Sequence, residues 1–414
     1  MAVFKPFKAY RPRPEEAGKI AAKPYDVLNS EEAREEVKGN PLSFLHVGKP
    51  EIDLDPSVDI YDPKVYEKGK ENLQNLIKDG HLVEDRQPYF YLYAQTMNGR
   101  TQNGLVGCAS VDDYWNDKIK KHEKTRKAKE EDRCNHVRVT NAHTGPIFLT
   151  YRDHKEINDI VAEIKKNPPE ADFTDEIDVR HQTWVITDTE TINNIETILK
   201  SVDSFYVADG HHRSAAAGIV GKERQKANPN HKGDEEYNFF LAVLFPGSEL
   251  HIMDYNRVVK NLNGNSPEDF INKIAQNFNI EKIGKDQFKP RHKGEIGMYL
   301  EGEWYKLTAN EELIKNPDPV ESLDVAILQK YVLSGILSIH DPRTDERIDF
   351  VGGIRGLGEL EKRVNSGEMK AAFAMYPTSV SELMAIADSG KIMPPKSTWF
   401  EPKLKDGLFV HFLD

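Results

Sequence analysis

The sequence predicts a mixed α/β protein of the α+β kind, organised as two domains. Apolar runs typical of buried strands alternate with segments whose apolar residues follow helical spacing, and this alternation indicates a layered architecture. Asn and Gly cluster at residues 261–266, which is typical of a domain boundary in a chain of 414 residues. We therefore expect one domain over residues 1–262 and a second, smaller α/β domain over residues 263–414.

Local patterns predict the elements of the first domain. Residues 63–81 carry apolar side chains at helical spacing and close on Asp79-Gly80, so we expect a helix there. Asn98-Gly99 predicts a hairpin within residues 87–111, because both positions tolerate positive φ. The remaining expected elements are a charged segment at 113–133, a helix at 155–166, and strands at 144–151, 182–188, 204–208 and 236–250.

The second domain is predicted in the same way. A capped helix is expected to begin at Ser266-Pro267-Glu268, and a hairpin is expected around Glu301-Gly302. The prolines of residues 391–413 prevent a long regular element there. The other expected elements are a helix at 321–336, a strand at 371–377 and a helix at 378–389 that begins at Thr378.

Charge and composition exclude several classes of partner. The formal charge of -12 argues against nucleic acid or an anionic membrane, since both attract basic surfaces. No stretch approaches the roughly 20 apolar residues of a membrane span, and the N-terminus lacks the pattern of a secretory signal, so we expect a cytoplasmic protein. Cys108 and Cys134 stand far apart, which indicates neither a disulfide framework nor a cysteine zinc site and predicts two buried or bystander thiols.

The strongest candidate site is DGHHR, residues 209–213, where a predicted strand meets a predicted helix from Ser214 onward. A helix N-terminus presents free N–H groups to an anion, and this segment adds side-chain donors at the same point. Asp209 offers a carboxylate for a magnesium ion that bridges phosphate oxygens, or it merely caps the helix while the histidines are solvated or core groups. The residues of the expected phosphate cradle are Gly210, His211, His212 and Arg213.

HEKT, residues 122–125, is the second candidate. It lies in a run of charges that is most often an exposed helix face. Glu123 beside His122 is alternatively a base that deprotonates a hydroxyl for in-line attack on phosphorus. HEKT is not HExxH, which excludes a zincin site.

Two further segments carry weaker signals. PPKSTWF, residues 394–400, is either a rigid surface loop or a binding loop for a small carboxylate or phosphate. Its cation and two hydroxyls are Lys396, Ser397 and Thr398. Asp26 in PYDV, residues 24–27, is either a turn acid or a site carboxylate.

Several segments together resemble the DUF1015 family over nearly the whole chain. They are ADGHHR, HEKT followed by EDR, GPIFLTY, LHIMDYNRV, DPRTDERIDFVGG and MPPKSTWFEPKL. The HE pair, DGHHR and the late PPKST segment are also similar, in the same order, to motifs of the free L-serine kinases of the ParB/sulfiredoxin-like superfamily. The gap between HE and DGHHR is longer here than in those kinases, and PYDV has no clear counterpart in them.

This resemblance implies a ParB/sulfiredoxin-like nucleotide-binding core and a magnesium-dependent kinase that converts free L-serine to O-phospho-L-serine. ATP and ADP both remain open as donors. The resemblance implies that Glu123 is the catalytic base beside His122, that DGHHR with Asp209 binds the nucleotide phosphates and metal, and that residues 396–398 bind serine. Phosphoserine dephosphorylation or reverse transfer in serine metabolism stays open, as does a nucleotide-binding regulatory module.

Overall fold

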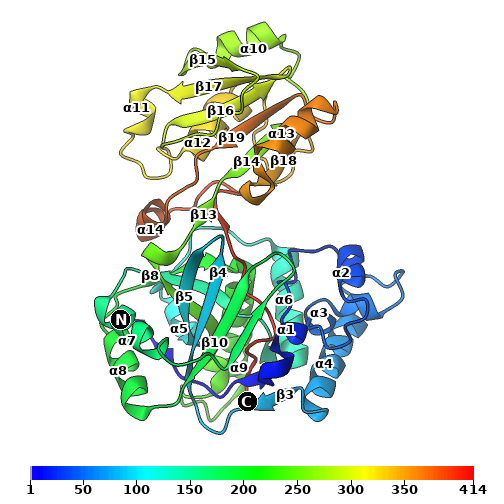
Figure 1. Cartoon of the computed structure of the whole chain (residues 1–414), viewed down its shortest axis with the longest axis vertical. Coiled ribbons are helices and arrows are strands. Elements are labelled where there is room, and N and C mark those ends of the chain that lie inside the picture. Colours follow the sequence, from blue (N-terminus) through cyan, green and yellow to red (C-terminus); the bar gives the residue numbers. More distant parts are fainter. Residues whose placement is uncertain (1) are drawn as a thin grey trace. The chain divides into compact units, whose positions relative to one another are not determined.

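The computed structural model describes residues 2–414, which form two compact units (Figure 1). The first unit runs to Leu250 and also contains Pro402–Asp414, and the second is His251–Glu401. The division precedes the expected boundary at residue 262, because the strands that follow Leu250 already belong to the second unit. The Asn and Gly cluster at 261–266 is instead a turn inside that unit.

A mixed sheet forms the centre of the first unit. Its order is β6-β11-β8-β12-β5-β4-β10-β9, and β1 pairs with β5 beyond the end of β4. β6 pairs in parallel with β11 and β8 pairs in parallel with β12, whereas the other pairs are antiparallel. The strands are β1 (Phe4–Lys5), β4 (Phe90–Met97), β5 (Arg100–Ser110), β6 (Ile119–Lys120), β8 (Ile147–Tyr151), β9 (Ala171–Thr174), β10 (Arg180–Ile186), β11 (Phe205–Asp209) and β12 (Phe239–Pro246).

Helices pack around this sheet and enclose its core. Apolar side chains of α7 and α8 join the buried core that the strands β8, β11 and β12 form. On the other side of the picture α6 packs against α9 and α4, and α1 to α4 share a second apolar cluster (Figure 1). The helices are α1 (Ala17–Ile20), α2 (Ser30–Glu36), α3 (Leu45–Gly48), α4 (Pro63–Lys78), α5 (Val111–Trp115), α6 (Lys127–Thr140), α7 (Lys155–Ile164), α8 (Thr189–Leu199) and α9 (His211–Ala227).

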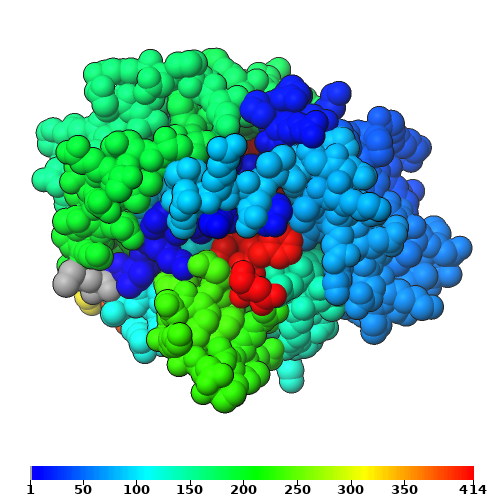
Figure 2. All heavy atoms as spheres, turned by 90° about the horizontal axis from the view of Figure 1, so that it is seen from below, coloured from blue at the N-terminus to red at the C-terminus, as the bar shows by residue number. Residues whose placement is uncertain are grey.

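The C-terminal segment threads through the first unit. β21 (His411–Phe412) pairs with β7 (Ala142–His143), and Val410 bridges to Tyr10. Figure 2 shows this segment in red, flanked by N-terminal segments in blue. A further small sheet joins β2 (Tyr10–Pro12) to β3 (Leu82–Glu84). The two ends of the chain are therefore part of one folded unit.

The second unit contains a six-stranded antiparallel sheet in the order β15-β17-β16-β19-β14-β18. Its strands are β14 (Tyr255–Val259), β15 (Phe278–Gly284), β16 (Glu295–Leu300), β17 (Glu303–Ala309), β18 (Ile348–Gly352) and β19 (Ala371–Met375). A short pair joins β13 (Ile252–Met253) to β20 (Trp399–Phe400). The helices are α10 (Pro267–Ile274), α11 (Glu311–Ile314), α12 (Asp324–Leu328), α13 (Gly356–Asn365) and α14 (Val380–Asp388). A π-helical turn, Gln329–Ser334, continues α12.

The structure confirms the predicted mixed α/β class and most of the expected elements. Asn98 and Glu301 both adopt positive φ in the turns of the two predicted hairpins. Helix α14 begins after Ser379, which forms a capping box with Glu382, so the prediction that Thr378 begins this helix is wrong. None of the helices between residues 2 and 414 combines the length and apolar content needed to span a bilayer. Cys108 and Cys134 are free and buried, as predicted.

Candidate functional site

The DGHHR motif lies at the junction of β11 and α9. β11 ends at Asp209, and Gly210 has φ +89°, a left-handed conformation that side-chain-bearing residues adopt at a cost. Helix α9 therefore begins at His211, three residues earlier than the predicted start at Ser214, and both histidines lie in its first turn. Gly210 is the N-cap and no side chain caps the helix, so the alternative in which Asp209 is a capping residue is wrong.

Strand pairing brings the HE pair to this junction. β6 pairs in parallel with β11, with Ile119 opposite Phe205 and Lys120 opposite Tyr206. The carboxyl ends of parallel strands meet at the same edge of a sheet, so the loop after β6 passes the end of β11. His122 and Glu123 lie in that loop, outside any helix, which excludes the exposed helix face that the surrounding charges indicated.

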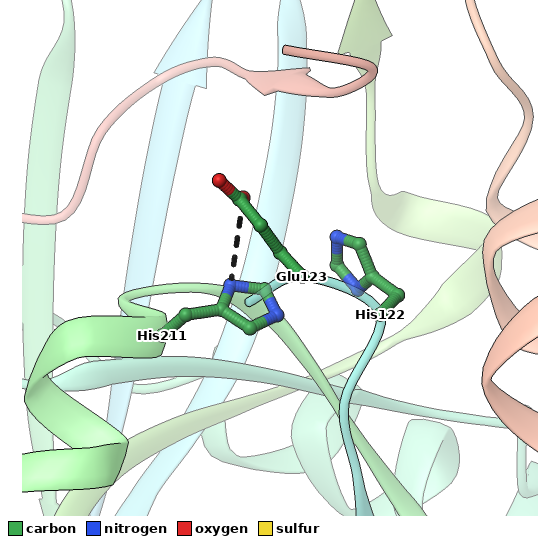
Figure 3. Close-up of side chains that lie close together, drawn as sticks. All are labelled: His122, Glu123 and His211. Atoms are coloured by element: carbon green, nitrogen blue, oxygen red, sulfur yellow. Dashed lines mark ion pairs between the residues drawn. The ribbon is translucent and has the colours of Figure 1, made fainter. Parts of the chain in front are cut away.

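Three side chains converge there, as Figure 3 shows. Glu123 Oε2 lies 4.0 Å from Nδ1 of His211, and the rings of His122 and His211 meet edge to face with centroids 4.5 Å apart. His122 is 1% exposed and His211 is 7% exposed, whereas the Glu123 side chain is 42% exposed. The carboxylate thus lies where a solvent-borne molecule can reach it, above two buried imidazoles.

Both histidines are held neutral. Burial lowers the pKa of His122 well below its ordinary value, the neighbouring His211 lowers it further, and the Asp209 carboxylate opposes the shift. Burial likewise lowers the pKa of His211 to about 4, although Asp209 raises it. Within residues 2–414, neither ring nitrogen of His122 nor Nε2 of His211 completes a hydrogen bond; the Val207 backbone lies near His122 without forming one. Buried polar atoms without partners are uncommon and indicate a ligand or water position.

The cluster has the chemistry of a transition-metal site. One ligand atom from each of His122, Glu123 and His211 lies within 4.8 Å of the other two. Two neutral imidazoles and a carboxylate suit zinc, manganese or iron, whereas magnesium prefers oxygen ligands. This set therefore fits a borderline metal ion better than it fits magnesium.

Asp209, the predicted magnesium ligand, already has partners. Its Oδ2 forms an ion pair with Lys403 Nζ at 2.7 Å, and its Oδ1 accepts the N–H of Gly210 at 2.8 Å. Burial raises the pKa of the Asp209 carboxyl, but Lys403 lowers it more, so the pKa lies below its ordinary value. The carboxylate is ionised and half-buried, and a magnesium ion there would compete with the Lys403 ammonium.

Arg213 is directed at Asp406 of the C-terminal segment. Its Nη1 and Nη2 donate to the two carboxylate oxygens at 2.8 and 2.7 Å, with side chains 15% and 4% exposed. Gly145 makes room for this pair, because a Cβ there would overlap both the guanidinium and the carboxylate. The structure therefore places Arg213, a predicted residue of the phosphate cradle, in an internal ion pair with Asp406.

The other predicted residues of this region lie around Arg213. His212 Nε2 accepts the backbone N–H of Arg126 at 3.0 Å. Asp26 is exposed. Burial lowers the pKa of His212 and the Asp26 charge opposes this shift, while Asp26 adds to the effect by which Asp406 raises the pKa of Arg213, so Asp26 lies near both residues. A cavity of about 30 Å³, large enough for water, is lined by residues that include Arg133, His136, His143, Arg213 and Asp406.

Sequence reasoning missed Lys403 and Asp406. Both lie in the C-terminal segment, 194 and 193 residues from their partners Asp209 and Arg213. Lys403 stands in the MPPKSTWFEPKL segment, so the charged residues after PPKST were the available signal. Because these partners lie so far apart along the chain, the sequence does not indicate which charges pair with Lys403 and Asp406.

Lys396, Ser397 and Thr398 belong to the second unit. Lys396 has φ +60° and an exposed side chain, which turns the loop sharply after two prolines. Ser397 Oγ donates to the Pro394 carbonyl at 2.6 Å, so this hydroxyl holds the loop. The Lys396 ammonium lies 5.6 Å from the ring centre of Tyr255.

Comparison with known proteins identifies the family. The family model described as "Protein of unknown function (DUF1015)" matches residues 4–326. No protein with a curated description matches the chain.

Among solved structures, a conserved hypothetical protein from Pyrococcus furiosus is 15% identical, with a TM-score of 0.37, over 75% of this chain and 95% of its own. A free serine kinase in complex with AMP is 13% identical, with a TM-score of 0.37, over 74% and 91%. SbnI from Staphylococcus aureus, with a C-terminal truncation, is 11% identical, with a TM-score of 0.39, over 74% and 87%.

Proposed function

The chain belongs to the DUF1015 family, and we propose that it is a phosphotransferase that phosphorylates free L-serine to O-phospho-L-serine with ATP or ADP as donor. The observation that carries the proposal is the meeting of HE with DGHHR at one edge of the sheet, with Glu123 Oε2 4.0 Å from His211 Nδ1. Phosphoryl transfer requires chiefly a base, positioning and charge neutralisation, and this edge supplies groups for each.

In this proposal Glu123 accepts the proton of the serine hydroxyl. The hydroxyl oxygen attacks the terminal phosphorus of the nucleotide in line, and the bond from that phosphorus to the leaving nucleotide oxygen breaks. His211 Nδ1 lies 4.0 Å from the Glu123 carboxylate, and burial keeps this imidazole neutral, so His211 itself adds no positive charge that would weaken Glu123 as a base. Bound magnesium would neutralise charge on the transferred phosphoryl group.

The phosphate cradle is expected to use the first turn of α9. Its backbone N–H groups carry the partial positive charge of a helix start, and no side chain caps them. Asp209 directly precedes this turn and is the proposed carboxylate for magnesium, with Lys403 beside it as a cation for phosphate oxygens. Lys396, Ser397 and Thr398 are proposed to bind the amino acid, with Lys396 as the cation.

A second candidate is phosphoserine hydrolysis, favoured by the convergence of His122, Glu123 and His211, three side chains of the kinds that hold a metal ion. A metal ion held there would lower the pKa of a bound water and supply a nucleophile at neutral pH. The two candidates differ in what Glu123 does, because it is a base in the first and a ligand in the second.

Mass spectrometry of reaction mixtures tests both candidates. The purified protein is incubated with magnesium, L-serine and either ATP or ADP, and in parallel with phosphoserine, with and without nucleotide, in magnesium, manganese or zinc. O-phosphoserine that requires both serine and nucleotide supports the kinase and identifies the donor. Serine released from phosphoserine without nucleotide, only with zinc or manganese, would replace the kinase by the hydrolase.

Glu123→Gln tests the base directly. We expect the rate to fall by at least about 100-fold while nucleotide binding is retained, because a base acts on the chemical step. Glu190→Gln is the matched control, since Glu190 is exposed on α8. A Glu123→Gln protein that keeps the wild-type rate contradicts the assignment.

A further inference from the structure

Arg257 is a buried arginine at the centre of the second unit. It lies on β14, opposite Phe350 of β18 on one side and Phe373 of β19 on the other, and it is 3% exposed. Its guanidinium donates to two backbone carbonyls, that of Tyr255 and that of Lys396, the latter at 3.0 Å. The side chain therefore reaches from the sheet to the loop that carries Lys396.

No Asp or Glu among residues 2–414 forms an ion pair with Arg257. Two other arginines with little solvent exposure do have carboxylate partners. Arg11 pairs with Asp85 and Glu170, and Arg213 pairs with Asp406. Burial accordingly lowers the pKa of Arg257 to about 10, whereas Arg11 and Arg213 have pKa values raised by their carboxylates. A buried charge without a counter-ion destabilises a fold, so a protein that retains one commonly uses it for a ligand.

Three segments that the sequence singled out meet at this arginine. LHIMDYNRV supplies Arg257 itself, and RIDFVGG supplies Phe350, whose ring centre lies 5.6 Å from the guanidinium carbon. PPKSTWF supplies the Lys396 carbonyl, because β13 and β20 pair and hold that segment alongside. These segments bring an aromatic ring and a backbone carbonyl to the guanidinium, and neither supplies a negative charge.

Two side chains of the PPKSTWF segment contact Tyr255, which lies beside Arg257 on β14. The Lys396 ammonium lies over Tyr255, the residue two positions before Arg257 on the same face of β14. Trp399 packs edge to face on Tyr255, with ring centres 5.0 Å apart, and donates to Glu401 rather than toward the arginine. The two carbonyls accept hydrogen bonds from two of the five N–H groups of the Arg257 guanidinium. The other N–H groups remain as donors, and the planar guanidinium suits a carboxylate or a phosphate.

We propose that Arg257 and Lys396 form an oxyanion site in the second unit, which binds the carboxylate or phosphate group of a small molecule through the guanidinium fork. The anion supplies the counter-charge that the protein does not. The identity of this anion as the carboxylate of serine or the phosphate of its product rests on the proposed function, whereas the presence of the site does not.

Calorimetric titration of the full chain tests the proposal. The probes are L-serine, inorganic phosphate and O-phospho-L-serine, so that the carboxylate and the phosphate are distinguished as sources of the anion. We expect the wild-type protein to bind at least one probe, Arg257→Gln to weaken that binding at least tenfold, and Lys396→Gln to weaken it severalfold. Arg257→Lys keeps the charge without the fork and should bind with intermediate affinity. Arg343→Gln is the matched control, because Arg343 is exposed and pairs with Asp341.

Each outcome decides the proposal. Wild-type protein that binds no probe, or folded Arg257→Gln protein that binds as tightly as the wild type, overturns it. Should Arg257→Gln fail to fold by circular dichroism, Lys396→Gln decides, because its side chain is exposed and its loss leaves the core intact. Binding that depends on Arg257, in a protein that shows no turnover, supports the anion site and contradicts the proposed kinase. Turnover with an unchanged serine KM in Arg257→Gln supports the kinase and contradicts the anion site.

Discussion

Replacing Asp406 by Asn should destabilise the first unit strongly. The carboxylate accepts both Nη groups of Arg213 at 2.8 and 2.7 Å, and the pair is nearly inaccessible to water. The amide would keep one accepting oxygen but would leave the guanidinium charge buried without a counter-ion. Neutralising one partner of a buried pair costs about 3–5 kcal/mol. Because one hydrogen bond to the amide oxygen survives, we expect a loss of about 3 kcal/mol, at the lower end of that range.

Urea unfolding followed by tryptophan fluorescence and circular dichroism measures this loss. With a slope of about 3 kcal/mol per M, the midpoint of the transition should fall by about 1 M. Asp159→Asn is the matched control, because Asp159 pairs with Lys155 at the surface with both side chains largely exposed, and exposed pairs contribute less than about 1 kcal/mol. An Asp406→Asn midpoint as close to the wild type as that of Asp159→Asn would refute the assigned role of the Arg213 pair.

Two further predictions follow from the structure. Gly145→Ala should destabilise the first unit in the same urea assay, because the new methyl group would overlap the buried ion pair, and an unchanged midpoint would show that the pair can shift. The stability of the second unit should depend on pH through Asp324. Burial raises the pKa of the Asp324 carboxyl to about 7, and the Glu382 charge adds to this shift. The Gly294 N–H, Lys293 and His292 oppose the shift. Since the folded pKa lies above the unfolded one, the folded form binds the extra proton, and stability falls as pH rises from about 4 through 7. Thermal unfolding should give a lower midpoint at pH 8 than at pH 5, and Asp324→Asn should remove this difference; a variant that keeps it would rule out Asp324 as the source.

Local signals in the sequence predicted the elements well. Asn98-Gly99 and Glu301-Gly302 form their hairpins because a two-residue turn with positive φ depends only on the residues in it. Ser266 caps α10 for the same reason. The predicted start of α9 at Ser214 is three residues too late. The positive φ of Gly210 lets the helix begin directly after it, at His211, and the polar residues 211–213 of this first turn carry no helical apolar pattern.

The site was predictable only in part, because long-range pairing built it. HE and DGHHR meet through a two-residue parallel strand pair, β6 with β11, which is too short to have a hydrophobic pattern of its own. Charge alone favoured an exposed position for HEKT, yet His122 is buried. In the sequence Arg257 is one residue of the LHIMDYNRV segment and carries no further signal. That no carboxylate pairs with it is a property of the tertiary structure.

The C-terminal segment determines what the DGHHR motif can do. Lys403 neutralises Asp209 and Asp406 neutralises Arg213, so both charges of the motif have partners within the first unit. Arg213, one of the four residues predicted to form the phosphate cradle, is therefore held by Asp406, whereas no side chain caps the first-turn N–H groups of α9. In the proposed phosphotransferase, a nucleotide phosphate that displaced Asp209 from Lys403 would free this carboxylate for magnesium at the same moment. Phosphate and metal would then bind together, as a phosphotransferase requires.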